Sequence, residues 1–249
     1  MKLKITKYKK STNGKYKVYL EDGRELSLYE ETILKFELLL KKEVTDIPKI
    51  NEYNLEWDVY YVALKSIKSR FKSVHDTREF LVKKEYPIEL IDKAIDRLVK
   101  QGYLNDDSFT KGFINSQIVT TSNGPYKIRR ELSDKGISSK IIDDNIDVFD
   151  DNLQIERINK LASKMLRSNR TRGGSVLRKK ITTDLVNMGY DAELIYKVLT
   201  NFSFNDTKEI AEREYNKLYK KYSKKYEGEE LNYKIKQAMY QKGLIYEEE

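Results

Sequence analysis

Apolar residues recur along most of the chain in a unit that is repeated four times. The copies align without gaps from Leu81, Leu132, Leu185 and Met239, so that successive copies begin 51, 53 and 54 residues apart. In each full copy a helical stripe ends at a short turn, one apolar residue and a polar pair follow, and a second stripe begins. The fourth copy is truncated after Leu244. The pattern predicts tandem helix–turn–helix units.

A glycine stands at the end of the first helix in three copies, as Gly136, Gly189 and Gly243. Glycine takes the left-handed conformation of a helix C-cap at little cost. Glu85 occupies the equivalent position of the first copy, so we expect that cap to be made differently. Ser73 and Asp76 have the spacing of a capping box at the start of the same helix.

Another helical stripe precedes each copy, which gives three helices in about 50 residues. One such unit cannot bury its stripe alone, and stacking on neighbours completes the core. We therefore expect a mainly α-helical protein, with tandem three-helix repeats in an elongated, curved array. The predicted segments are 51–104, 105–150, 151–204 and a truncated fourth repeat, 205–249.

Residues 1–50 have a different pattern and predict a small β-containing segment followed by a helix. Apolar residues alternate on both sides of an expected turn at 11–14, and Asp22-Gly23 is typical of a two-residue hairpin. A third short strand is expected at 25–28. Ser27 and Glu30 have capping-box spacing, so we predict a helix from Leu28 to Lys42. Its expected core residues are Ile33, Leu34, Phe36 and Leu40.

Composition excludes several kinds of chemistry. The chain has no cysteine and a single histidine, His75, which excludes disulfides and argues against histidine metal sites and a Ser–His–Asp triad. Phosphate-binding, zinc-protease and dinucleotide motifs are missing. We therefore expect a protein that is not an enzyme and has no cofactor. No apolar run is long enough for a membrane span and no signal core is present, so we expect a cytoplasmic protein.

Charge is concentrated in a few segments of a chain with net charge +8. The stretch from Lys160 to Lys180 holds eight basic residues and no acid, and a second cluster follows Gly124-Pro125. Arginine is frequent in the first cluster although lysine dominates elsewhere, which favours bidentate recognition of phosphate or carboxylate. An ordinary solvated helix face is the alternative interpretation. The candidate residues are Lys127, Arg129, Arg130, Lys164, Arg167, Arg170, Arg172, Arg178, Lys179 and Lys180.

Other conspicuous residues are expected to be structural. The tyrosines at helical spacing, among them Tyr215, Tyr219, Tyr222 and Tyr226, are predicted to pack in cores or interfaces rather than stack on bases. Acidic pairs such as Asp150-Asp151 adjoin predicted helix starts, where carboxylates cap the helix, and this role is favoured over Mg²⁺ binding. Trp57 is expected to open the first helix of the first repeat as a packing anchor, and His75 to lie at the surface.

Three stretches of the chain resemble the RecX family of RecA regulators. The strongest is Gly124-Pro-Tyr-Lys-Ile128-Arg-Arg-Glu131-Leu132-Ser-Asp-Lys135-Gly136-Ile137, and the others are Ala63 to Leu81 and Leu98 to Phe109. The segment from Asp22 to Phe36 is similar to an N-terminal extension found in members from Gram-positive bacteria. The chain departs from the family at Glu85, at Thr110, at Gln117 and in its shortened fourth repeat.

The resemblance implies a non-enzymatic regulator that binds the RecA filament on single-stranded DNA and generally inhibits its recombinase and ATPase activities. The implied partners are the RecA filament and single-stranded, or also double-stranded, DNA, and we expect a monomer. In this interpretation the repeats lie across adjacent RecA protomers, and the basic residues of 167–180 face acidic RecA surface or DNA phosphates. A helix–turn–helix transcriptional regulator that reads a duplex site is the alternative, and a pure protein-binding scaffold is a third class.

Overall fold

The computed structural model describes residues 2–11, 14–204 and 208–245. Contacts divide the chain into two compact units. The first comprises Met1–Thr110 with Lys135–Ser138, and the second comprises Lys111–Asp134 with Ser139–Glu249. Each unit is described by itself.

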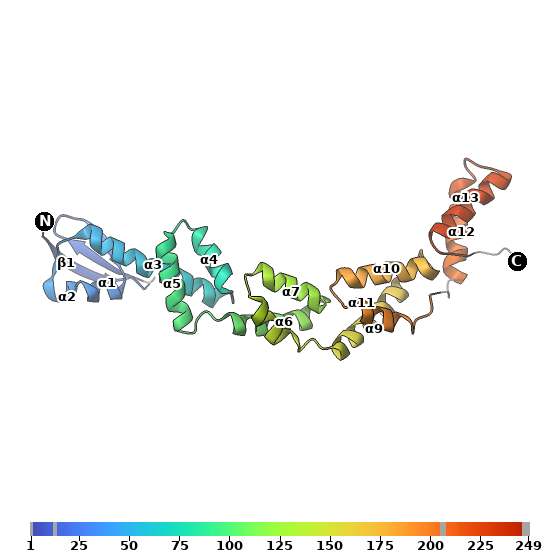
Figure 1. Cartoon of the computed structure of the whole chain (residues 1–249). Helices are drawn as coiled ribbons and strands as arrows, with labels where there is room; N and C mark the ends of the chain where they lie inside the picture. Colours follow the sequence, from blue (N-terminus) through green and yellow to red (C-terminus); the bar gives the residue numbers. More distant parts are fainter. Residues whose placement is uncertain (1, 12–13, 205–207, 246–249) are drawn as a thin grey trace. The chain divides into compact units, whose positions relative to one another are not determined.

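The first unit begins with a four-stranded antiparallel sheet in the order β3-β2-β1-β4 (Figure 1). The strands are β1 (Leu3–Lys10), β2 (Tyr16–Leu20), β3 (Glu25–Leu28) and β4 (Glu43–Val44). The hairpin at Asp22-Gly23 is confirmed, since Gly23 has a φ of +86° and the Leu20 amide donates to the Arg24 carbonyl. The third strand is confirmed as well. The turn expected at 11–14 includes residues 12 and 13, which lie outside the described residues.

The single helix predicted from Leu28 to Lys42 is wrong. Two short helices, α1 (Glu30–Lys35) and α2 (Leu38–Lys41), are separated at Glu37, whose φ of +53° interrupts the helical backbone. Ile33 is buried, whereas Leu34 and Leu40 are 60% and 83% exposed. Ser27 does not cap α1, whose N-cap is Tyr29. The helix has no side-chain cap, and the amide of Tyr29 donates to the side chain of Asn54 (2.8 Å), a residue far along the sequence.

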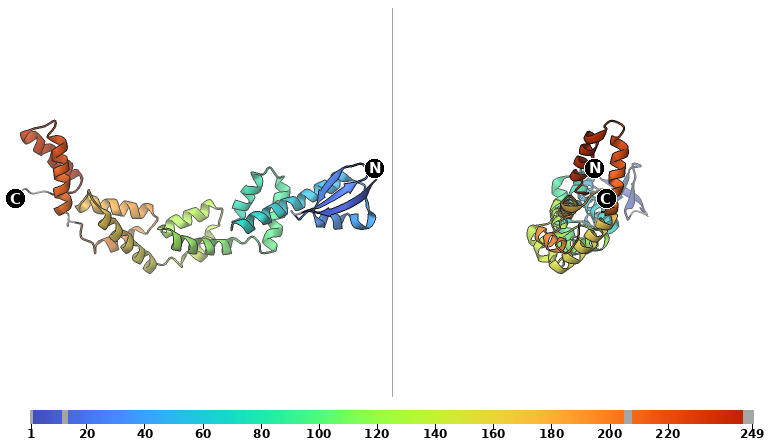
Figure 2. Two further views of the ribbon diagram at one scale, coloured as in Figure 1. Left: turned by 180° about the vertical axis from the view of Figure 1, so that it is seen from behind. Right: turned by 90° about the vertical axis from the view of Figure 1, so that its right-hand side faces the viewer.

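The helix α3 (Ile47–Ser69) joins the sheet to the first helices, and Figure 2 shows it leading away from the strands. Its first turns belong to the core of the sheet, through Ile50. Further along, the Asp58 carboxylate accepts hydrogen bonds from Lys15 (2.6 Å), Tyr29 (3.0 Å) and Tyr86 (2.7 Å). Trp57 lies in the middle of α3 rather than opening it. It does act as an anchor, because the Arg97 guanidinium lies 4.2 Å from its ring centre.

The remaining helices follow one another in groups, which we number from one to four (Figure 1). Group one is α3, α4 (Val74–Val82) and α5 (Ile88–Lys100), and group two is α6 (Asp106–Thr120), α7 (Pro125–Asp134) and α8 (Ser139–Ile146). Group three is α9 (Asp151–Ser168), α10 (Gly174–Asn187) and α11 (Ala192–Leu199), and group four is α12 (Lys208–Tyr222) and α13 (Gly228–Gln241). The predicted fold class, mainly α with tandem three-helix repeats and a small N-terminal β segment, is confirmed. The curvature of the array stays a prediction.

The second helix of each group ends in a left-handed residue. Gly136, Gly189 and Gly243 have φ values of +74°, +88° and +67°, as their caps require. The expectation of a different cap at Glu85 is wrong, because Glu85 adopts the same conformation with a φ of +62°. The predicted cap at Ser73 is confirmed, since its hydroxyl accepts from the Asp76 amide (3.0 Å).

Close packing explains why three of these turns carry glycine. A Cβ on Gly136 would lie 2.5 Å from the His75 Cβ, one on Gly189 would lie 2.6 Å from the Lys127 Cβ, and one on Gly243 would lie 3.0 Å from the Val176 Cβ. Each glycine turn therefore meets the start of the second helix of the group before it. We call these three contacts the glycine joints. No helical group precedes Glu85 among the described residues, and its turn makes no such joint.

Candidate nucleic-acid and protein interface

All ten predicted basic residues lie in the second unit. Three are on α7, and the other seven extend from the end of α9 through the connecting loop into α10. The residues on α7 are Lys127, Arg129 and Arg130. Those that follow are Lys164 and Arg167 on α9, Arg170 and Arg172 in the loop, and Arg178, Lys179 and Lys180 on α10.

Besides Arg170, whose guanidinium donates to two main-chain carbonyls, five of the ten are exposed and have no carboxylate partner in the part of the chain that the structure describes. We call them the free cations: Arg130, Lys164, Arg167, Arg172 and Lys179. A cation that is not neutralised by its own protein remains available to an anionic partner. This subset is the strongest part of the predicted site.

The other basic residues have partners within the chain or are half-buried. Arg129 forms an ion pair with Asp143, and Lys180 pairs with Asp184 at 2.7 Å, one helical turn away. Arg170 donates to the main-chain carbonyl of Arg167 at the end of α9 (2.8 Å). The Arg178 guanidinium lies 5.4 Å from the centre of the Tyr196 ring. Lys127 is half-buried. The structure therefore separates residues that sequence treated as equivalent.

The arginine-bearing loop between α9 and α10 is held by its own side chains and by group four. The side-chain amide of Asn169 donates to the main-chain carbonyl of Arg172 (2.6 Å), and the Arg213 guanidinium donates to the main-chain carbonyl of Arg170. The Gly173 amide donates to the Lys242 carbonyl (2.9 Å) at the third glycine joint. The loop is thus ordered before any partner arrives, which lowers the entropy cost of binding.

The start of α7 is fixed to group three in a similar way. The Gly124 amide donates to the Met188 carbonyl (2.7 Å), and the Tyr126 amide donates to the Gly189 carbonyl (3.0 Å). Arg157 of α9 adds a clamp, because it donates to the carbonyls of Ile118 (2.6 Å) and Thr121 (2.5 Å). The structure therefore connects the two basic clusters through α9 and the turn after α10.

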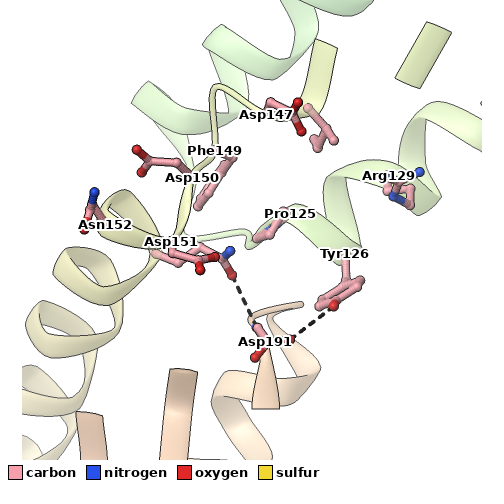
Figure 3. Close-up of a pocket in the computed structure, with 11 residues that line it drawn as sticks. Pro125, Tyr126, Arg129, Asp147, Phe149, Asp150, Asp151, Asn152 and Asp191 are labelled. Atoms are coloured by element: carbon pink, nitrogen blue, oxygen red, sulfur yellow. Dashed lines mark hydrogen bonds between the residues drawn. The ribbon is translucent and has the colours of Figure 1, made fainter. Parts of the chain in front are cut away.

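A cavity of about 600 Å³ lies beside the basic side of α7 (Figure 3). Its lining includes Tyr126 and the carboxylates of Asp147, Asp150, Asp151 and Asp191. Asp150 caps α9, as predicted, and Asp191 caps α11 in the same way. Asp191 also accepts the Tyr126 hydroxyl hydrogen bond (3.1 Å), which raises the pKa of that hydroxyl. Two of the cavity carboxylates, those of Asp150 and Asp191, therefore have a structural role as helix caps.

No group of three histidine, cysteine, aspartate or glutamate residues has the geometry to hold a metal ion among residues 2–11, 14–204 and 208–245. Within the same ranges, no helix combines the length and the apolar character needed to cross a membrane.

Group four carries further basic and aromatic residues that were not part of the predicted site. Five lysines and four tyrosines lie within 215–226 without an acid, which is the signal that could have drawn attention to them. The structural interpretation is supported for Tyr215, Tyr222 and Tyr226, which pack against the core between α12 and α13. Tyr219 is instead 48% exposed, and on α13 Tyr233 and Tyr240 are 62% and 83% exposed.

Comparison with known proteins places this architecture among regulatory proteins. A family model described as the second three-helix domain of RecX matches residues 105–144. Regulatory protein RecX of Streptococcus sanguinis is 31% identical over 248 residues, which cover 97% of this chain and 95% of that protein. Regulatory protein RecX of Listeria welshimeri is 27% identical over 253 residues, with 99% and 94% covered.

Solved structures share the fold. A crystal structure of regulatory protein RecX aligns with a TM-score of 0.68 at 23% identity, covering 79% of this chain and 98% of the other. RecX from Lactobacillus salivarius aligns with a TM-score of 0.56 at 21% identity, covering 60% and 97%. The full-length relatives and the shared fold lead to one conclusion: this chain belongs to the RecX family of regulatory proteins.

Proposed function

We propose that this protein regulates the RecA recombinase by binding the RecA filament on single-stranded DNA, in its groove or at its end. Binding lowers the recombinase and ATPase activities of the filament. The relationship to RecX regulatory proteins over 97% of the chain supports the regulatory role. The action is one of binding, without a catalytic step or a cofactor, by a cytoplasmic monomer.

The observation that carries the binding mode is the set of free cations on an ordered loop and its flanking helices. Arg172 and Lys179 are exposed, and the backbone between them is tied to group four by the Gly173 amide. Ordered cations of this kind suit the phosphates of DNA or acidic groups on a protein filament. We therefore assign the contact with the filament to Arg130, Lys164, Arg167, Arg172 and Lys179.

The test is to titrate the protein into RecA of the same organism during ATP hydrolysis on single-stranded DNA. Inhibition well below one protein per RecA is expected. The variant R167Q/R172Q/K179Q should bind the filament more weakly and with a flatter salt dependence, because each lost phosphate contact lowers the slope by about 0.7. The matched control K65Q/K93Q/K100Q removes the same charge from exposed positions of α3 and α5 and should inhibit normally.

Equal inhibition by both variants at every salt concentration would contradict the assigned surface. A lack of any effect on RecA, together with tight binding to one preferred duplex sequence, would instead favour the helix–turn–helix transcriptional regulator.

A further inference from the structure

Helix α13 has an exposed face that carries two solvent-facing tyrosines. The helix buries Leu231, Ile235 and Met239 against α12. Tyr233 and Tyr240 are 62% and 83% exposed. They are seven residues apart, which is two helical turns and about 10 Å. Lys236 is exposed between them. Residues with this spacing share one side of a helix, so the side of α13 away from its core presents two rings and a cation.

The end of α12 and the turn that leads into α13 add unpaired positive charge. Lys220, Lys224 and Lys225 are exposed and have no carboxylate partner in the described part of the chain. On α12 the acid nearest to them, Glu214, is 2% exposed and is paired with Lys242. Three exposed glutamates, Glu227, Glu229 and Glu230, lie at the start of α13, and none of them forms an ion pair with these lysines among the described residues. The hairpin of α12 and α13 combines free cations with exposed aromatic rings.

This face is in register with the basic residues of the earlier groups. When Leu132, Leu185 and Met239 are aligned, Lys234 takes the position of Lys127 and Lys180, and Tyr233 takes the position of Tyr126 and Lys179. The second helix of groups two, three and four thus carries a pair of cationic or aromatic residues at the same register position, in the first turn of α7 and in the second turn of α10 and α13. In sequence register, group four repeats the pattern of the predicted basic residues and adds rings to it.

We propose that α13 and the turn before it form a binding site for single-stranded nucleic acid, with Tyr233 and Tyr240 stacking on bases and Lys220, Lys224, Lys225 and Lys236 contacting phosphates. Exposed rings offer stacking platforms to unpaired bases of any sequence, and the lysines follow the backbone. An acidic peptide would use the lysines but would gain little from the two rings. The site deepens the proposed function, because it names a part of the chain that contacts DNA, but it does not depend on RecA.

The test measures binding of the full chain to a fluorescently labelled oligothymidylate by anisotropy, without RecA. The variant Y233A/Y240A should lose about tenfold in affinity for each ring removed. The matched control Y233F/Y240F keeps both rings and should bind within about twofold of the unmodified chain. The variant K220Q/K224Q/K225Q should bind more weakly and with a smaller salt slope. Because these side chains are exposed, all variants should unfold at the same urea concentration as the unmodified chain.

Two outcomes would overturn the site. One is unchanged oligothymidylate binding by Y233A/Y240A. The other is competition by polyglutamate as effective as that by unlabelled oligothymidylate of equal charge, which would indicate an acidic protein partner. Oligothymidylate binding by R167Q/R172Q/K179Q, measured in the same way, shows how much of the binding belongs to the surface proposed for the filament rather than to this site. Failure of RecA inhibition with intact oligonucleotide binding rejects the proposed function and leaves this site in place.

Discussion

Gly189 lies against Lys127, so closely that a Cβ on the glycine would sit 2.6 Å from the Cβ of the lysine. The contact joins the turn after α10 to the first turn of α7, on which the predicted basic residues begin. Gly124 and Gly189 also face each other, since a Cβ on Gly124 would clash with the Gly189 carbonyl and lie 2.7 Å from the Tyr190 amide nitrogen. Because Gly124 and Gly189 have no side chains, the start of α7, which carries basic residues, can pack closely against the turn after α10.

Replacing Gly189 with alanine should lower the free energy of unfolding by more than about 2 kcal/mol, because it combines backbone strain at a φ of +88° with a collision. The matched control is G102A. Gly102 has a φ of +77° but open space around it, so its variant should lose only about 1 kcal/mol. Urea unfolding of both variants measures the difference. Equal losses would show that the glycine is needed for its backbone conformation alone.

The third glycine joint should control the order of the arginine-bearing loop. G243A should speed hydrogen exchange of the Gly173 amide by about tenfold or more, because that amide donates to the carbonyl of Lys242. G228A is the control, since Gly228 also has a positive φ, of +54°, in the same hairpin, but no atom of the described residues lies within 4 Å of its Cβ position. If Gly173 exchanges at its original rate in G243A, the joint does not hold the loop.

Arg157 should be among the residues on which the stability of the second unit depends. Its guanidinium donates to the carbonyls of Ile118 and Thr121 and to the Tyr190 hydroxyl (3.0 Å). R157Q should cost about 3 kcal/mol, because hydrogen bonds from a charged donor contribute more than neutral ones. Y190F removes one partner and should cost about 1 kcal/mol, with losses in the double variant that are not additive. R130Q, at an exposed position, should change stability by no more than about 0.5 kcal/mol.

The Asp58 cluster should make the first unit sensitive to acid. Burial raises the pKa of Asp58, but the hydrogen bonds from Lys15, Tyr86 and Tyr29 outweigh it and hold the pKa below its ordinary value. A carboxyl with a lowered pKa stabilises the fold above its unfolded pKa, near about 3.9, and loses this contribution as the pH falls toward the folded value.

The variant D58N removes the titrating group. It should be less stable than the unmodified chain at pH 7, and the difference should shrink as the pH falls below about 4. Urea unfolding between pH 3 and pH 7 tests this. A difference that stays constant over that range would show that Asp58 contributes only through its packing.

Much of the helical fold could be predicted from sequence because its signals are local. The glycine turns, the Ser73 cap and the Asp22-Gly23 hairpin each depend on a few consecutive residues. The errors fall where distant residues decide the outcome. Asn54 of α3 accepts the amide of Tyr29, the N-cap of α1, and Ser27 does not cap the helix. Glu37 and Glu85 adopt positive φ without being glycine, and no local rule predicts this of glutamate.

The candidate site was predictable in its location but not in its composition. Runs of basic residues beside Gly124 and Gly173 indicated where to look. Whether a cation is free depends on partners 14 or 18 residues away, such as Asp143 for Arg129 and Tyr196 for Arg178. Exposure of Tyr233 and Tyr240 likewise depends on which side of α13 packs on α12. The helical spacing of the tyrosines does not by itself tell whether their side is buried or exposed.

The glycine joints have a direction, since the turn of one group always meets the second helix of the group before it. An interior repeat therefore contributes its glycine turn to one joint and the start of its second helix to the next. Glu85 belongs to the first group, whose turn contacts no earlier group. Inserting one complete copy of an interior repeat would create an additional joint made from partners already compatible with each other. The chain can thus lengthen by whole repeats while using only contacts of a kind that it already contains. Insertion of a partial repeat would leave one joint without its glycine.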